Sequence, residues 1–143
     1  MNQMRWLNRS QPQTLYSSVL LCYFSAGFLL FGSGIDYQLT LDIVGLFASD
    51  STAEDLGDAL VPIVVTLLLG GAFAAGGLGT ANERRWGHRL CAAAAVYSTL
   101  ATLWWTARTQ FGLGILMRLM FDVLLLVLIF HPLSRNHRRI WFQ

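Results

Sequence analysis

The sequence contains little charge, no lysine, and only two cysteines and three prolines. Charged residues make up 13% of its 143 residues, about half of their usual share in soluble domains. With 55% hydrophobic residues, the chain is neither a disordered segment nor a nucleic-acid-binding arm, so we expect no nucleic acid among its partners. Two cysteines are also too few for a disulfide-rich secreted scaffold.

Long uncharged runs take the place of the missing charge. Residues 10–35, 59–82 and 90–107 carry no formal charge, and a fourth apolar segment, 113–131, carries two charged residues. A helix of roughly 17 to 25 such residues crosses the hydrocarbon core of a bilayer, where its backbone bonds within itself. We therefore predict an all-α integral membrane four-helix bundle. It is a single domain, 1–143, with spans at about 14–33, 59–79, 90–107 and 113–131.

Two other interpretations fit the apolar runs less well. A soluble four-helix domain needs polar helix faces, and segments this apolar provide none. The second interpretation is a secretory leader, because Arg5 and Arg9 precede the apolar stretch 15–24. No A-x-A cleavage pattern follows that stretch, so we expect it to remain as the first span.

The arginines predict the orientation of the chain in the membrane. Eight of the ten lie on one side of the four spans: before the first, between the second and third, or after the fourth. They are Arg5, Arg9, Arg84, Arg85, Arg89, Arg135, Arg138 and Arg139. Because cytoplasmic segments carry an excess of arginine and lysine, we expect both termini in the cytoplasm and the protein in a bacterial inner membrane.

The segment between the first two spans is predicted to be a long acidic external loop. Six of the eight acidic residues lie there, namely Asp36, Asp42, Asp50, Glu54, Asp55 and Asp58. Its stretch 39–47 is apolar enough to lie on the membrane surface or against a neighbour. Ser51 and Glu54 have the spacing of a capping box. The second helix begins either just after Ser51, with Pro62 inside it, or nearer Ala59, with Pro62 in its first turn.

Small residues recur at four-residue spacing in the second and third spans. Among them are Gly70, Gly71, Ala74 and Gly76 in the second span and Ala94 and Ser98 in the third. Such spacing lets membrane helices approach each other closely. We expect these two spans, joined by the short connection 80–89, to pack together as antiparallel neighbours. Contact of the small-residue face with another subunit is the alternative.

Two charged residues, Arg118 and Asp122, lie well inside the fourth predicted span. Four positions apart, they share one helix face, and a charge in hydrocarbon costs at least about 2.5 kcal/mol on insertion scales. We predict an intramembrane ion pair between them. Two other interpretations remain open: a proton- or ion-binding carboxylate at Asp122 whose affinity Arg118 sets, and a charge pair with another subunit.

The segment from Leu133 to the end mixes arginines with large apolar residues. Arginines attract an anionic leaflet, and aromatic rings enter the headgroup layer. We therefore predict that Arg135, Arg138, Arg139 and Trp141 bind the membrane surface.

No catalytic, metal or cofactor site is predicted. The histidines, His88, His131 and His137, lie at or beyond the inner boundary, and only the first two could approach each other as haem ligands. Cys22 and Cys91 lie in different spans without a C-x-x-C pair, so we expect separate apolar fillers rather than a redox site. Serine-nucleophile and phosphate-loop patterns are absent from the sequence. We therefore do not expect an enzyme.

These features favour a small accessory or structural subunit of a larger bacterial inner-membrane complex. Its partners are then the lipid bilayer and other membrane subunits, and it should co-purify with other chains. The alternative is a small oligomeric transporter or channel that uses Asp122 and Arg118, in which Asp122→Asn abolishes flux but leaves assembly intact. A third hypothesis is a lipid or quinone site beside Trp104 and Trp105.

Overall fold

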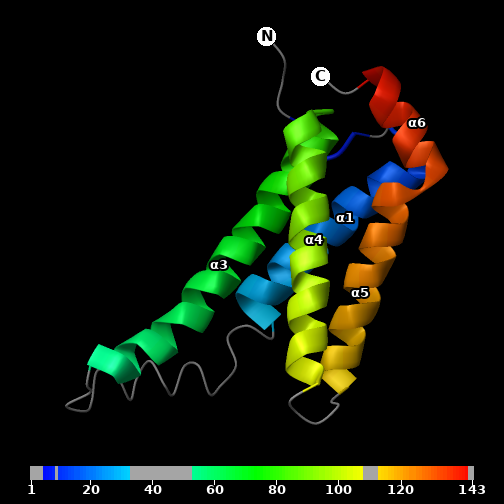
Figure 1. The fold of residues 1–143 in the computed structure, drawn as a ribbon. Helices are drawn as coiled ribbons and strands as arrows, with labels where there is room; N and C mark the ends of the chain where they lie inside the picture. The colour runs from blue at the N-terminus through cyan, green and yellow to red at the C-terminus, as the bar shows by residue number, and fades with distance from the viewer. Residues whose placement is uncertain (1–4, 9, 33–52, 108–112, 142–143) are drawn as a thin grey trace.

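The computed structural model describes residues 5–8, 10–32, 53–107 and 113–141, and Figure 1 shows how they fold. This described part consists of five α-helices and one π-helical turn and contains no strand. The elements are α1 (Gln13–Gly27), the π-helical turn η1 (Phe28–Gly32), α3 (Ala53–Ala81), α4 (Arg85–Thr106), α5 (Leu113–Phe130) and α6 (Pro132–Trp141). The prediction of an all-α protein is confirmed.

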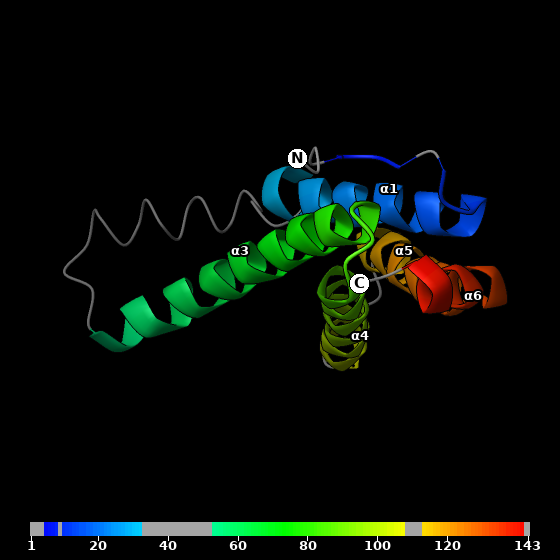
Figure 2. The same ribbon diagram turned by 90° about the horizontal axis from the view of Figure 1, so that it is seen from above.

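Four long helices pack around one apolar core. α1 contacts α3 and α5, and α4 contacts the same two helices. Seen from above in Figure 2, α4 stands end-on, α1 runs crosswise to it, and α3 runs away to one side. Phe73 of α3 is the largest fully buried side chain among the described residues. It shares the core with Cys22, Ala26, Leu29, Leu69, Cys91, Ala94, Ala95, Leu125 and Ile129.

Two of the described helices are long and apolar enough to cross a membrane. These are the segments Gln13–Phe31 and Val64–Ala81. A third candidate arises if Ile115–Phe130 and Pro132–Trp141, which meet at a bend of 53°, form one broken span. The chain is therefore a membrane protein with two to three candidate spans, fewer than the four that the sequence predicts.

The third predicted span, 90–107, lies in α4, which is not among these candidates. This segment contains the run of alanines 92–95, which are only weakly apolar, and the hydroxyl side chains of Ser98, Thr99 and Thr102. Thr99 satisfies its hydroxyl by donating to the Ala95 carbonyl at 2.8 Å. The position of α4 in the molecule therefore depends on its packing against α3 and α5 more than on its own hydropathy.

The second helix is longer than its predicted span. α3 begins at Ala53 and not near Ala59, so Pro62 lies inside the helix. Residues 33–52 lie outside the described residues. Most of the predicted external loop, including its apolar stretch 39–47 and the capping residue Ser51, therefore lies outside the described residues.

A three-residue turn, 82–84, connects α3 to α4. The Arg84 amide donates to the Gly79 carbonyl at 2.9 Å, and the Glu83 amide donates to the Thr80 carbonyl at 3.0 Å, a pattern that caps helix C-termini. Glu83 has a left-handed backbone, with φ at 58°, where glycine is usual. The turn sets α3 and α4 side by side in opposite directions.

Cys22 of α1 and Cys91 of α4 form a disulfide, so the expectation of two separate apolar fillers is wrong. The cysteines are 69 positions apart, and only the tertiary fold brings them together. Two glycines of α3 leave room beside the bridge. A β-carbon at Gly76 would stand 2.9 Å from the Cys91 amide nitrogen, and one at Gly77 would stand 3.1 Å from the Cys22 β-carbon.

Candidate functional site

A buried polar cluster joins α4 to α5 in the interior. It consists of Ser98 on α4 and of Arg118 and Asp122 on α5. The Ser98 hydroxyl donates to Oδ2 of Asp122 at 2.5 Å, and Nη2 of Arg118 donates to the Ser98 oxygen at 3.3 Å. Ser98 and Asp122 expose only 1% and 2% of their surface. Ser98 therefore links the guanidinium to the carboxylate by acting as donor and acceptor at once.

The predicted partners Arg118 and Asp122 are thus connected through a third residue. Within the described residues, no nitrogen of Arg118 lies within 4.0 Å of a carboxylate oxygen of Asp122, and Nε of Arg118 is buried without a hydrogen-bond partner. Four-residue spacing placed both on one helix face but could not reveal Ser98 as the link. The sequence assigned Ser98 to helix packing, because its hydroxyl acquires this role only when α4 lies against α5.

The space beside the cluster is small and largely apolar. A cavity of about 10 Å³ lies between α1, α4 and α5, and a single water needs roughly that volume. Its lining residues are Phe24, Ser25, Phe28, Leu29, Ser98, Arg118, Phe121 and Asp122. The rings of Phe24 and Phe121 pack together, with centroids 4.9 Å apart. Asp122 therefore faces packed protein rather than a water-filled channel.

The predicted helix-packing residues face different neighbours. Gly76 faces α4, whereas a β-carbon at Gly70 would stand 2.7 Å from a leucine side chain of η1. Gly71 has open space around it. Ala94 is buried in the core, and Ala74 packs at the edge of the core. The small-residue face of α3 is therefore divided between α1, α4 and the outer surface.

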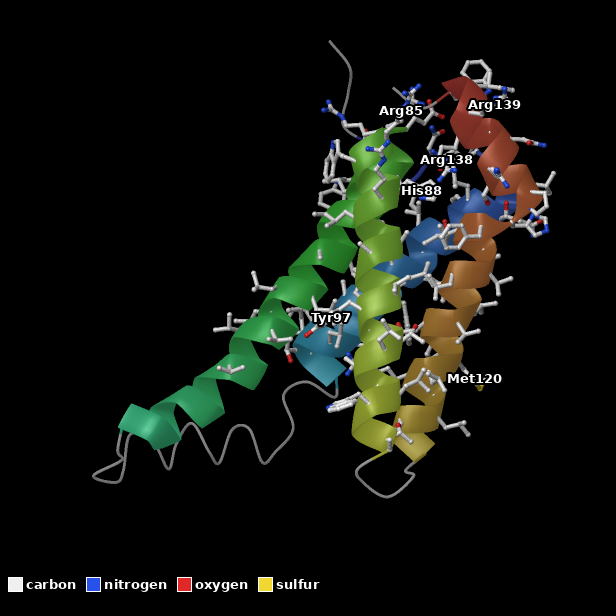
Figure 3. All side chains as sticks on the ribbon, in the orientation of Figure 1. Arg85, His88, Tyr97, Met120, Arg138 and Arg139 are labelled. Atoms are coloured by element: carbon white, nitrogen blue, oxygen red, sulfur yellow. A yellow bond between two sulfur atoms is a disulfide. The ribbon has the colours of Figure 1, made fainter. Side chains whose placement is uncertain are left out.

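A second polar site lies at the arginine-rich end of the molecule, where α6 approaches α4. Figure 3 shows Arg85 and His88 of α4 close to Arg138 and Arg139 of α6. The bend before α6 follows from Pro132, which cannot donate a backbone hydrogen bond and is favoured as a first helical residue.

His88 is buried at this site and anchors α6 to α4. Only 2% of its surface is exposed, and its Nε2 lies 2.7 Å from Nη1 of Arg138. Because arginine stays protonated, it is the donor, so Nε2 accepts and the neutral ring carries its proton on Nδ1. Burial lowers the pKa of His88, a backbone hydrogen bond partly opposes that effect, and the charge of Arg138 lowers the pKa further.

Further hydrogen bonds join three distant parts of the chain at the same end. Asn8 donates to Oε1 of Glu83 at 3.2 Å, and Nε2 of His137 lies 3.4 Å from that oxygen. Gln11 donates to the Thr80 carbonyl at 2.9 Å. The segment before α1, the α3–α4 turn and α6 are therefore held together by polar contacts.

A cavity of about 790 Å³ opens between α4 and α6. We call it the arginine cavity, and its lining residues are Arg85, Arg89, Phe130, Pro132, Arg135, Asn136, Arg138 and Arg139. No acidic residue of the described chain lines it. Arg135, Arg138 and Arg139, predicted as membrane-surface residues, thus line a concave site with arginines of α4. Trp141 does not line it and is exposed.

The remaining sequence candidates do not form a site in the described structure. Trp104 is exposed on α4, and the side chain of Trp105 lies outside what the structure describes. Nδ1 of His131 accepts a hydrogen bond from the Leu133 amide at 3.3 Å, at the start of α6. No group of three or more His, Cys, Asp or Glu that could hold a metal occurs among the described residues.

Comparison of the chain with known protein families, with characterised proteins and with solved structures finds no match.

Proposed function

We propose that this chain is a small structural subunit of a larger protein complex in the bacterial inner membrane, without catalytic activity of its own. One observation carries the proposal: the first half of α3 stands away from α4 and α5, as Figures 1 and 2 show. The side chains Val61, Val64, Leu67 and Leu68, up to the middle of α3, are exposed, Leu68 by 69%. This exposed apolar surface, which we call the α3 face, is the proposed contact with another subunit.

Packing energetics support a protein neighbour for the α3 face. In lipid, apolar side chains gain little from burial, so membrane helices associate through close packing. The second half of α3 has such packing, because Gly70, Phe73 and Gly76 lie against η1, the core and α4. In the first half, the described side chains Val61 and Val64 are exposed instead. A partner helix on the α3 face would give them close packing.

The proposal includes a four-helix membrane bundle with both termini in the cytoplasm. The contacts of α1 and α4 with both α3 and α5 support the bundle. The orientation is supported by the arginines, since Arg85 at the start of α4 and Arg138 and Arg139 of α6 gather at one end (Figure 3). Cytoplasmic ends of membrane proteins carry such an excess.

Size measurement and cross-linking together test the accessory role. We expect the tagged chain, extracted from its own host in mild detergent, to elute with a protein mass well above its own 15.9 kDa and with a constant set of partner chains. A photo-cross-linking residue at Leu68 should give one stoichiometric protein adduct. At Met120, equally exposed on α5, it should give none. A lone monomer with no Leu68 adduct would refute the proposal.

The Arg118–Ser98–Asp122 cluster distinguishes the structural role from the alternative of a proton- or ion-coupled transporter. We expect no ion flux in liposomes and a loss of about 3 kcal/mol of stability in Asp122→Asn, because Arg118 loses its buried counter-charge. The double variant Asp122→Leu/Arg118→Met should recover most of that loss, since no charge then remains buried. Flux in the wild type that Asp122→Asn abolishes without destabilising the protein would favour the transporter.

A further inference from the structure

The arginine cavity concentrates positive charge, and no acidic side chain of the described residues lines it. Five arginines line it, two from α4 and three from α6. Glu83 is the acidic residue of the neighbouring turn, and it contacts Asn8 and His137 instead. Like charges gathered in one cavity repel each other, so an anion bound among them would stabilise the site.

The guanidinium groups suit a phosphate better than most anions. Each presents a planar fork of donors that matches two phosphate oxygens. The volume of about 790 Å³ lies within the range of ligand sites and exceeds what a lone phosphate needs. Asn136 adds an amide that can donate to a further oxygen.

The apolar part of the lining indicates where the ligand comes from. Phe130 and Pro132 lie at the junction of α5 and α6, where the candidate span bends, and both are exposed. With the predicted span 113–131 in the bilayer, this apolar edge faces the hydrocarbon and the arginines of α6 lie beyond it. Basic pockets between helices at the cytoplasmic surface bind lipid headgroups in this way.

We propose that the arginine cavity binds the phosphate headgroup of an anionic phospholipid, with Arg89, Arg135 and Arg139 as its principal ligands and Phe130 against the start of the acyl chains. The bond between Arg138 and His88 holds α6 at the distance from α4 that the cavity requires. This inference is independent of the accessory role, because it needs the membrane but no partner subunit.

Lipid retention by the full chain tests the site. The probes are phosphatidylglycerol and phosphatidylcholine with identical acyl chains, titrated into detergent micelles and counted on the protein by native mass spectrometry. We expect one phosphatidylglycerol to be retained with about tenfold or greater preference over phosphatidylcholine. Equal retention of the two lipids in the wild type would overturn the proposal whatever the variants do.

Two double variants with the same net charge distinguish binding in the arginine cavity from general attraction of the lipid to a positively charged surface. Arg89→Gln/Arg139→Gln removes two cavity arginines, whereas Arg5→Gln/Arg84→Gln removes two from the same end that do not line the cavity. We expect the first pair to weaken phosphatidylglycerol binding about tenfold or more and the second pair to leave it nearly unchanged. Equal weakening by both pairs would show that general surface charge attracts the lipid, and would overturn the site.

A last experiment compares phosphatidylglycerol with inorganic phosphate and with a water-soluble glycerol phosphate as ligands. If the ligand is a lipid, neither should raise the thermal midpoint of the wild type in phosphatidylcholine-containing micelles as phosphatidylglycerol does. A midpoint raised equally by free phosphate, and lost in Arg89→Gln/Arg139→Gln, would assign the cavity to a soluble phosphate and refute the lipid.

Discussion

Two buried polar side chains of α4 determine how this helix is held by its neighbours. Ser98 bonds to Asp122 and Arg118 of α5, and His88 accepts a bond from Arg138 of α6. A buried polar group that loses its partner costs roughly 1 to 3 kcal/mol, so each of these contacts specifies one arrangement of the helices. Single substitutions here should loosen one neighbour and spare the other.

We predict that the docking of α6 weakens in mild acid because of His88. Its folded pKa lies below the ordinary value of 6.5, so the unfolded chain binds the extra proton. Stability is therefore complete above about pH 6.5 and falls as the pH drops toward the folded pKa. The thermal midpoint in detergent should fall between pH 7.5 and pH 5.5, and His88→Gln should lose this part of the slope. Identical slopes for the two proteins would contradict the assignment.

The glycines of α3 set how closely this helix approaches its neighbours. The tightest approach lies at the end of the helix, where a β-carbon at Gly79 would stand 2.6 Å from the α-carbon of Gly87 on α4. The two backbones are thus in direct contact beside the turn. Neither Gly79 nor Gly87 is among the predicted packing residues, because four-residue spacing relates residues within one span and this contact crosses the turn.

Matched alanine substitutions in α3 should have opposite effects on stability. Gly71→Ala meets no atom within 4 Å and should stabilise the protein by up to about 1 kcal/mol, the gain in helix propensity. Gly79→Ala forces the α3 and α4 backbones apart and should cost about 1 to 3 kcal/mol. Unfolding in mixed micelles of increasing denaturing detergent measures both. A stabilising Gly79→Ala would show that the two helices are not in such close contact.

For the whole molecule, the disulfide joins the two helices that face each other across the core. α1 and α4 both pack on α3 and α5, and the Cys22–Cys91 bridge connects them directly beside the glycines of α3. Both cysteines are almost fully buried, so reducing agents have little access to them in the folded protein. The bridge therefore limits how far the four long helices can separate.

We predict that Cys22→Ser/Cys91→Ser lowers stability by up to about 4 kcal/mol, the loop-closure value for a separation of 69 residues. That value is an upper limit, because the unfolded state in a membrane remains helical and loses less entropy. Thermal unfolding with and without reductant should give a lower midpoint for the variant and for the reduced wild type. Maleimide labelling of both cysteines in the unreduced, denatured wild type would contradict the bridge.

The sequence by itself determined the helical class and the apolar segments. In lipid, the backbone of an uncharged run such as 10–35 or 59–82 must form its hydrogen bonds within a helix. Composition and run length are therefore sufficient to predict that α1 and α3 are helical. The clustering of arginines is also visible in the sequence, because it depends only on order along the chain. The bend before α6 is marked by Pro132, which directly follows the predicted fourth span, 113–131.

Only the tertiary structure decided which side chains meet. The Cys22–Cys91 bridge, the link through Ser98 and the arginine cavity each join residues from separate helices. The spacing of these residues along the chain does not reveal which of them meet. Each depends on how closely helices approach each other; beside the disulfide, for example, Gly76 of α3 lets that helix lie against the backbone of Cys91 because it has no β-carbon. The length of an apolar run determines that the segment forms a helix. Contacts between helices depend on three-dimensional packing, and the sites are formed by those contacts.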